Sequence, residues 1–231
     1  MRFAAMHIEV RVEMSCSETE GIRQLHGKPE SVRTDQPQLS ETKGRLMTTA
    51  IANPTSTVVW KIDPAHSQAD FKIRHMMISN VRGSFSGLDG TLTENTSDPT
   101  LSQIDASIDI ATVNTGDPKR DEHLRSSDFF DVQKYPTMTF KSTKVEKKGE
   151  GEYSITGDLT LHGVSRSVVF VVDGPSAPGK DPYGNIRIGL SASTKINRND
   201  FGLSFNAVLE SGGVLLGEEV QVDLDVQFIK S

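Results

Sequence analysis

From Thr57 to the end of the chain, apolar and polar residues alternate, which is the pattern of β-strands with one buried face. Residues 104–110 show it most clearly, because Asp105, Ser107 and Asp109 separate four apolar positions. No stretch outside residues 117–135 keeps a helical period. The pattern therefore predicts an all-β protein of roughly eight strands. Nine stretches carry it, at residues 58–62, 66–75, 81–92, 104–110, 138–141, 153–162, 165–173, 186–196 and 220–228.

The length of these strands and the short connections between them favour an extended eight-stranded antiparallel β-barrel over a sandwich of two sheets. Several strands reach ten residues, which corresponds to about 34 Å at the ordinary rise of a strand. Glycines between Val81 and Leu92 predict bends or bulges in that part of the sheet.

The expected interior of the barrel contains small residues. An eight-stranded barrel is just wide enough to be filled by its own side chains or to hold one small ligand. Aromatic residues make up only 6% of the chain. An elongated apolar tunnel that suits an acyl or prenyl chain is predicted by the small residues Ala106, Gly157, Ala192 and Thr194. A fully packed barrel is the alternative.

One long and chemically mixed connection interrupts the strands. It reads R-D-E-H-L-R-S-S-D-F-F-D-V-Q-K-Y-P-T-M-T-F-K-S from Arg120 to Ser142. Its polar first part predicts a helical connection near residues 117–135. Long connections in compact domains are commonly lids or binding loops, so this segment is the first place to look for function.

Residues 1–56 differ from the rest of the chain and predict a disordered tail that ends in a short linker. The first 47 residues carry seven Lys/Arg and seven Asp/Glu without strand or helix periodicity. An alternative is that synthesis begins at Met47, ten residues before the first strand. In either case residues 57–231 form the β-barrel domain.

Composition and charge exclude several classes of protein. Charged residues interrupt the apolar run near the N-terminus, so no secretory signal is recognised and a cytoplasmic location is expected. No apolar run is long enough to span a bilayer. The net charge of -6 disfavours a nucleic-acid partner. The single cysteine, Cys16, lies outside the β-rich part, which excludes an internal disulfide and thiol catalysis in the barrel.

Motifs of enzymes and metal sites are missing from the sequence. It contains no G-x-S-x-G nucleophile motif, no P-loop and no dinucleotide-binding fingerprint. His66, His75, His123 and His162 have spacings that match no zinc-site pattern. We therefore predict no cofactor, no metal site and a protein that is not an enzyme.

Several longer motifs follow one another along the predicted barrel. They are I-D-P-A-H-S at 62–67, H-M-M-I-S-N-V-R-G-S-F at 75–85, the connection from Arg120, T-G-D-L-T-L-H-G-V at 156–164, I-N-R-N-D-F-G-L at 196–203 and G-E-E-V at 217–220. With them, the chain from about Val59 to Lys230 resembles the YceI-like family.

The resemblance implies a lipocalin-like barrel that encloses a polyisoprenoid or related long-chain amphiphile, often in a homodimer. Members of the family are often periplasmic and carry a secretory signal, and no such signal is recognised in this sequence. Ser165 stands where a threonine is more usual in the family. A homodimer stays open, because one sequence does not show which strand edge or outer face would pair.

Polar candidates for binding the head group of an amphiphile occur together in the long connection. Arg120 suits a phosphate or carboxylate, with Asp121 and His123 beside it. The alternative is an Arg–Asp pair that fastens the helix to the barrel.

A second cluster, Arg198, Asp200 and Phe201, either lines the same opening or caps the end of the barrel. The predicted ligand-binding residues are Phe71, Ile108, Arg120, Asp121, His123, Phe129, Met138, Phe140, Leu190, Arg198 and Phe201, and Phe130 and Tyr135 are further candidates for the cavity wall.

These observations predict that the protein binds a long-chain amphiphile, of polyisoprenoid or fatty-acyl type, and carries or stores it inside the barrel. A hydrolase or isomerase that acts on such a lipid through Asp121 and His123 is one alternative. A ligand-free dimeric structural protein is the other. The expected partner is the lipid, with no nucleic acid and no membrane-spanning segment.

Overall fold

The computed structural model describes residues 56–209 and 212–231. The predicted tail at residues 1–56 lies outside the described residues except for Ser56, so both interpretations of it remain predictions. Alternating sequence forms strands throughout the described part of the chain: β1 (Thr57–Ile62), β2 (Gln68–His75), β3 (Ser79–Phe85), β4 (Leu88–Asn95), β5 (Gln103–Asp109), β6 (Thr137–Lys147), β7 (Glu152–Leu161), β8 (Val164–Asp173), β9 (Gly179–Lys180), β10 (Ile186–Asn197) and β11 (Leu216–Lys230).

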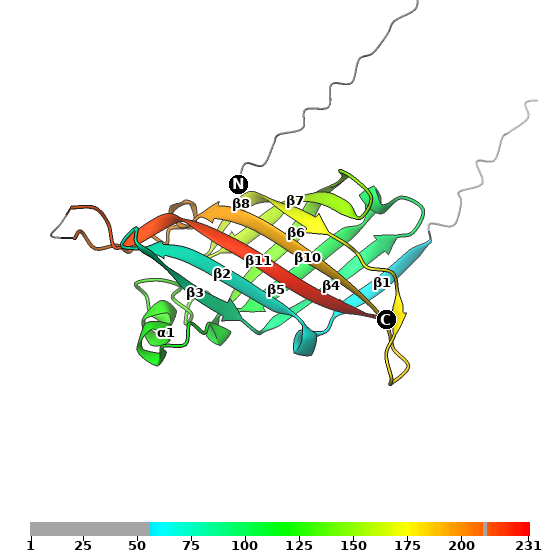
Figure 1. The fold of residues 1–231 in the computed structure, drawn as a ribbon, viewed down its shortest axis with the longest axis horizontal. Coiled ribbons are helices and arrows are strands. Elements are labelled where there is room, and N and C mark those ends of the chain that lie inside the picture. Colours follow the sequence, from blue (N-terminus) through cyan, green and yellow to red (C-terminus); the bar gives the residue numbers. More distant parts are fainter. Residues whose placement is uncertain (1–55, 210–211) are drawn as a thin grey trace, which may run out of the picture. The chain divides into compact units, whose positions relative to one another are not determined.

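The strands form one antiparallel sheet that closes on itself. Neighbours follow the order β11–β1–β4–β5–β6–β7–β8–β10, and β10 pairs with β11 from Arg187↔Ile229 to Asn197↔Glu219. This ring of eight confirms the predicted extended eight-stranded antiparallel β-barrel (Figure 1). β2 and β3 lengthen one wall, and the two-residue β9 adds to the edge of β10.

Two long strands of the wall are broken into shorter pieces. β1 and β2 pair with successive parts of β11, at residues 228–230 and 216–225. Between them Pro64, which has no amide hydrogen to donate, begins the 3-10 helix η1 (Pro64–His66). β3 and β4 are separated at Gly87, as the glycine pattern predicts. The other short 3-10 helices are η2 (Pro99–Leu101), η3 (Ile110–Thr112) and η4 (Arg198–Phe201).

Gly83 has a different role from the predicted bend. It lies in an unbroken ladder between β2 and β3, directly opposite Phe71. A Cβ at this position would lie 2.4 Å from Cζ of Phe71, which is far inside van der Waals contact. The glycine therefore provides the surface on which the Phe71 ring rests.

The predicted helical connection contains one short helix, α1 (Pro118–Arg125). Asp117 caps it by accepting from the amide of Lys119 at 3.0 Å, and Pro118 occupies the first turn. The residues from Ser126 to Pro136 form turns rather than helix, so the helical part is shorter than predicted. This eight-residue helix is the only α-helix of the described residues, and no helix among them is long and apolar enough to cross a membrane.

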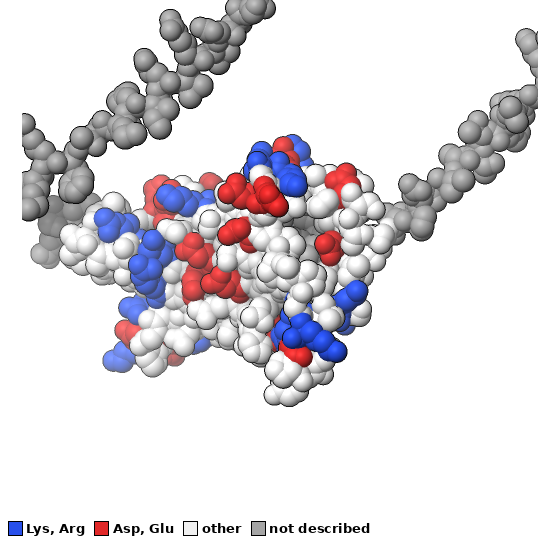
Figure 2. Space-filling view, turned by 45° about the vertical axis from the view of Figure 1, so that its right-hand side comes forward, with Lys and Arg blue, Asp and Glu red and all other residues white. Residues whose placement is uncertain are grey.

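The two ends of the barrel differ in packing. At one end Trp60, Leu92 and Ile188 are buried at 3–6% exposure and close the interior. The other end carries α1, the β2–β3 turn and the loop before β11 (Figure 1). Charges cover the outer surface, with Asp and Glu across the middle of the face in Figure 2 and a group of Lys and Arg near its left-hand end.

Candidate functional site

A cavity of about 680 Å³ occupies the interior of the barrel. Its lining extends from Ile62 and Phe228, near the closed end, to His75, Ser79 and Leu215 beside the β2–β3 turn. Ser79 is exposed, so the cavity reaches the molecular surface at the end that carries α1. The barrel is therefore hollow over most of its length, as the small interior residues predict.

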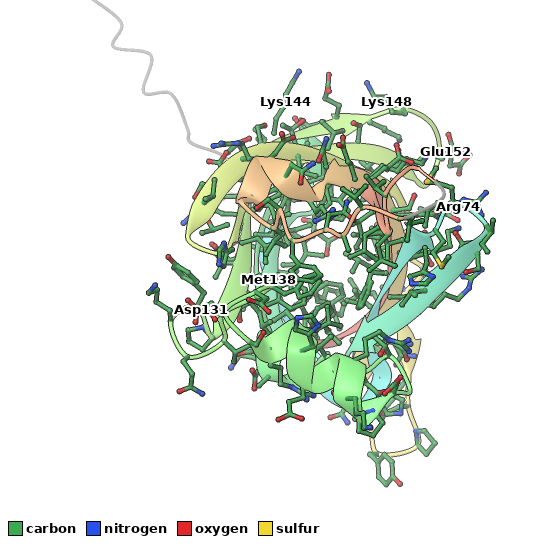
Figure 3. All side chains as sticks on the ribbon, turned by 90° about the vertical axis from the view of Figure 1, so that its left-hand side faces the viewer. Arg74, Asp131, Met138, Lys144, Lys148 and Glu152 are labelled. Carbon is green, nitrogen blue, oxygen red and sulfur yellow. The ribbon has the colours of Figure 1, made fainter. Side chains whose placement is uncertain are left out.

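Inward positions of the strands make the walls apolar. On β10 and β11 every second residue faces the cavity, as in Leu190, Ala192 and Thr194. Met138 of β6 points into the interior in the view down the barrel (Figure 3). Six predicted wall residues line the cavity: Phe71, Ile108, Phe129, Met138, Phe140 and Leu190. Phe130 lines it as well, whereas Tyr135 packs against His162 outside it.

Gly157 contributes to the cavity in a way that the sequence does not predict. It is absent from the lining, whereas Ala106, Ala192 and Thr194 are part of it. A Cβ on Gly157 would lie 2.4 Å from Cζ of Phe140, so the ring occupies the space above the glycine. Phe140 in turn meets Phe170 edge to face, with ring centroids 5.1 Å apart. Gly157 thus positions an aromatic wall rather than leaving empty space.

Arg120 and His123 of α1 lie at the mouth of the cavity. Arg120 donates from Nε to Oγ1 of Thr115 at 2.7 Å and from Nη2 to the carbonyl of Thr115 at 2.9 Å. His123 bonds Asp128 at 3.0 Å and packs edge to face against Phe129 and Phe205. Both side chains are therefore held in place where they face the cavity entrance.

The structure does not bring Asp121 to the cavity with the other predicted ligand-binding residues of α1. Asp121 is only 7% exposed and does not line the cavity. Its carboxylate accepts from the amide of Thr115 at 2.8 Å and from the hydroxyl of the same residue. Residues two apart on a helix point to different faces, so Asp121 and His123 do not meet. Asp121 fastens α1 to the preceding loop, and it does so without pairing with Arg120.

Arg198 is a buried cation at the cavity wall. It is 4% exposed, and its guanidinium donates to the carbonyls of Gly217 at 2.8 Å, Phe205 at 2.9 Å and Leu203. Within the described residues no carboxylate lies within ion-pair distance of it. Burial lowers the pKa of the Arg198 guanidinium below its usual value, and the charge of Glu218 partly opposes this. The structure thus places a positive charge beside an apolar cavity.

Nε and Nη1 of the Arg198 guanidinium are hydrogen-bonded, and no hydrogen bond from Nη2 is found among the described residues. Arg198 also contributes to the lining of the cavity. The guanidinium is therefore held in place at the cavity wall.

Phe201, the other predicted member of the Arg198 cluster, does not line the cavity. It is 1% exposed and packs in the core at η4, where its carbonyl accepts from Nδ1 of His162 at 3.3 Å. Asp200 is exposed and forms no ion pair with Arg198. The cluster therefore divides, with Arg198 at the cavity and Phe201 in the cap of the barrel.

Several lining residues escape the sequence analysis because they lie outside strands. The loop after η4 brings Leu203, Phe205 and Leu215 to the cavity mouth. The alternation Leu203–Ser204–Phe205 is the one signal that would have indicated an inward face, but it is too short to separate from chance. His75 also lines the mouth. His75 and His123 both contribute to the cavity lining, but the described chain holds no group of three or more His, Cys, Asp or Glu side chains that could hold a metal ion.

Residues 60–228 match the YceI-like domain. The chain belongs to the YceI-like family. It is 37% identical over 173 residues to a UPF0312 protein of Pseudomonas putida strain W619, which covers 74% of this chain and 86% of that protein. A UPF0312 protein of Photorhabdus laumondii is 38% identical over 163 residues, or 71% of this chain and 84% of that protein.

Solved structures of the YceI-like type share the barrel. The Campylobacter jejuni YCEI protein is 32% identical, with a TM-score of 0.58, over 69% of this chain and 91% of that one. BcnA of Burkholderia cenocepacia is 20% identical, with a TM-score of 0.61, over 72% and 98% of the two chains. A polyisoprenoid binding domain from Saccharophagus degradans is 19% identical, with a TM-score of 0.53, over 75% and 99%. The last two likenesses concern the fold alone.

Proposed function

We propose that this YceI-like protein binds a long-chain amphiphile, of polyisoprenoid or fatty-acyl type, in its barrel and carries or stores it. The observation that carries the proposal is the apolar cavity of about 680 Å³ that reaches the surface at one end. Its size falls in the range of about 300–1,000 Å³ that is typical of small-molecule pockets. Its walls are almost entirely aliphatic and aromatic.

The walls supply enough binding energy for an aliphatic chain without many polar contacts. Each buried methylene contributes about 0.8 kcal/mol, so ten of them contribute ~8 kcal/mol before the entropy of ordering the chain is subtracted. The Saccharophagus degradans neighbour, which shares the barrel, is described as a polyisoprenoid binding domain. This supports a ligand of the same class.

An anionic head group fits the polar groups of the cavity. Arg198 contributes to the cavity lining, and among the described residues no carboxylate lies within ion-pair distance of its guanidinium. A phosphate or carboxylate at this point would accept a charge-assisted hydrogen bond and relieve the buried charge. Arg120 and His123 offer further donors at the mouth.

The geometry gives less support to the alternatives. A hydrolase or isomerase that works through Asp121 and His123 needs both groups at one substrate, but Asp121 is bonded to Thr115 outside the cavity. A ligand-free structural protein has no use for a hollow apolar interior. Binding without chemistry on the ligand is therefore the function that the site favours.

The direct test is to identify what co-purifies. Protein isolated from its native host is extracted with organic solvent, and the extract is analysed by mass spectrometry. A lipid in stoichiometric amount is expected. Protein that is empty, and that also fails to bind fluorescent fatty-acyl and prenyl probes, would contradict the proposal.

A variant that fills the cavity sharpens this test. Ala192 faces the interior at the middle of β10, and Ala192→Phe places an aromatic ring where the aliphatic chain of the ligand would lie. If the ring displaces three methylenes, the loss of ~2.4 kcal/mol weakens binding of a fatty-acyl probe about 50-fold. Ser191→Phe, on the exposed side of the same strand, is the matched control and should bind normally. Equal affinities of the two variants, both folded by circular dichroism, would place the ligand elsewhere.

A further inference from the structure

The end of the barrel at which the cavity reaches the surface exposes apolar side chains on two neighbouring loops. The β2–β3 turn presents Met76, Met77 and Ile78, of which Ile78 is 79% exposed. The loop between η4 and β11 presents Val208 and Val214, which bridge to each other. We call these five residues the apolar tip. Large apolar side chains that gather on an exposed surface are a mark of an interaction site.

The apolar tip forms part of the rim of the cavity. The amide of Met76 donates to the carbonyl of Leu215 at 2.7 Å, which joins the two loops. Leu215 lines the cavity, and so do His75 and Ser79 on either side of the β2–β3 turn. Whatever binds the apolar tip therefore faces the entrance through which a ligand would pass.

The backbone of the β2–β3 turn adds independent support. Met76 and Met77 both adopt positive φ, at 51° and 61°, and the amide of Ile78 closes the turn on the carbonyl of His75 at 3.1 Å. Such turns ordinarily use Gly, Asn or Asp, because larger side chains are strained there. Two methionines and an isoleucine are poor choices for a turn in water, so their side chains serve something other than the fold.

Basic side chains stand directly behind the apolar tip. Lys72 and Arg74 of β2 and Arg82 of β3 alternate with the cavity-lining residues, so they face outward, and Lys72 is paired in register with Arg82. Figure 3 shows Arg74 pointing away from the interior. None of the three forms an ion pair in the part of the chain that the structure describes.

Acidic groups on the adjacent strand, Asp223 among them, form no ion pair with this cluster in the described part of the chain. Glu219 of β11 is paired with Lys195 at 2.9 Å, and Glu218 acts on buried Arg198. The protein as a whole has a net charge of -6. The apolar tip is therefore flanked by a local positive charge, although the net charge of the protein is negative.

We propose that the apolar tip inserts into the interfacial region of an anionic lipid bilayer, with Lys72, Arg74 and Arg82 over the lipid phosphates. Apolar side chains with adjacent cations are the combination that binds such surfaces. The surface itself is independent of the cavity, but the choice of a lipid partner rests on the proposed function. Docking in this orientation turns the mouth of the cavity toward the membrane, so a lipid passes between the two without crossing water.

The test measures sedimentation of the full-length chain with vesicles of phosphatidylcholine alone or mixed with phosphatidylglycerol. Wild type should bind the anionic vesicles and prefer them to the neutral ones. Met77→Asp with Ile78→Asp should weaken this binding more than about tenfold, because two inserted apolar side chains become charged. Aspartate tolerates positive φ, so this variant should keep its fold. Arg74→Gln with Arg82→Gln should cost about fivefold per charge on anionic vesicles only.

Tyr183→Asp is the matched control, because Tyr183 is 90% exposed on the β9–β10 hairpin at the opposite end of the barrel (Figure 1). It should bind vesicles like wild type. The proposal is overturned if wild type binds neither kind of vesicle, if it binds both equally, or if the Met77/Ile78 variant binds as well as the control. Ultracentrifugation that shows a dimer dissociated by the same variant would assign the apolar tip to a second copy instead.

Failure of docking and failure of lipid carriage give different results. A fluorescent fatty-acyl probe, added without vesicles, reports on the cavity alone. If the Met77/Ile78 variant binds the probe normally but not the vesicles, both proposals stand. If wild type binds vesicles through the apolar tip but takes up no probe, docking stands and lipid carriage fails.

Discussion

At the scale of single residues, the structure separates groups that the sequence places side by side. Asp121 and His123 lie two residues apart, which allowed the interpretation that they act together on a lipid. The carboxylate of Asp121 accepts hydrogen bonds from Thr115, whereas His123 bonds Asp128 and packs edge to face against both Phe129 and Phe205. The hydrogen bonds, rather than the spacing in sequence, therefore show the roles of the two residues. Asp121 stabilises the fold, and His123 lies at the cavity mouth.

This assignment predicts that Asp121→Ala destabilises the protein. Its removal leaves the partly buried amide and hydroxyl of Thr115 without the carboxylate as acceptor, so the free energy of unfolding should fall by about 1–3 kcal/mol. Urea unfolding followed by circular dichroism measures it. His123→Ala, with an exposed side chain, should change stability much less but weaken a probe with a polar head group. A stable Asp121→Ala protein that has lost turnover of a lipid ester would restore the enzyme interpretation.

Some residues of the candidate site could be predicted from the sequence and others could not. Residues on strands were predictable, because alternation assigns every second one to the interior, and Phe71, Met138 and Leu190 follow this rule. Phe201 was misplaced because it lies in a 3-10 helix, where a period of two carries no information. Loop residues such as Phe205 depend on how the chain folds back after η4, and no local pattern encodes that path.

At the scale of elements, aromatic rings and glycines fit together across strands. Gly157 of β7 lies opposite Ser142 of β6, and the Phe140 ring covers it. Gly83 of β3 and Phe71 of β2 repeat the arrangement on the other side of the barrel. An aromatic side chain over a strand glycine protects the backbone at that point and fixes the ring. Two rings of the cavity wall are positioned in this way.

Gly157→Ala should therefore destabilise the barrel. The added Cβ would meet Cζ of Phe140 at 2.4 Å and the carbonyl of Lys141 at 2.5 Å, and overpacking of this kind costs about 1–3 kcal/mol. Gly189→Ala in β10 is the control, since its nearest neighbour is a carbonyl 3.7 Å away, and it should change stability by less than about 0.5 kcal/mol. The midpoints of urea unfolding compare the two. Equal midpoints would mean that the Phe140 ring moves freely.

The elements themselves were largely predictable, and the exceptions have local causes. Strands with a buried face were recognised, including the separate strands on either side of Asp63-Pro64, but the predicted strand at residues 81–92 is divided at Ser86-Gly87 into β3 and β4. The helical connection was predicted too long, because Asp117 and Ser126 confine α1 to eight residues. The β2–β3 turn lies in the gap between the predicted strands 66–75 and 81–92, although its two methionines are not turn residues by composition.

At the scale of the whole molecule, the barrel has one closed and one accessible end. The closed end is fastened by a cluster of charges outside the apolar core. Arg187 of β10 donates to Asp181 beside β9 at 2.7 Å and to Asp63 before η1, while His66 bonds Asp63 at 2.8 Å. The cluster joins two segments far apart in the sequence, residues 63–66 and 181–187, and it leaves the opposite end free to admit a ligand. Whether two such barrels form a homodimer stays a prediction.

The closed end makes stability depend on pH in a definite direction. The hydrogen bond from Arg187, followed by that from His66, lowers the pKa of Asp63 from 3.8 to about 2, and Arg187 also holds the pKa of Asp181 well below its usual value. A carboxyl group with a lowered pKa in the folded state binds its proton less readily there than in the unfolded chain. Its contribution to stability is therefore complete above about pH 4 and is lost as the pH falls toward about 2.

Asp63→Asn tests this account, because it removes the ionised partner without changing the size of the side chain. The variant should be less stable than wild type at neutral pH, and the difference should shrink as the pH falls from about 4 to about 2, where wild type itself becomes protonated. Urea unfolding across this range measures the difference. Asp158→Asn, an exposed carboxylate whose side chain makes no ion pair or hydrogen bond among the described residues, is the control. A difference between Asp63→Asn and wild type that stays constant down to low pH would show that the cluster contributes through shape and not through charge.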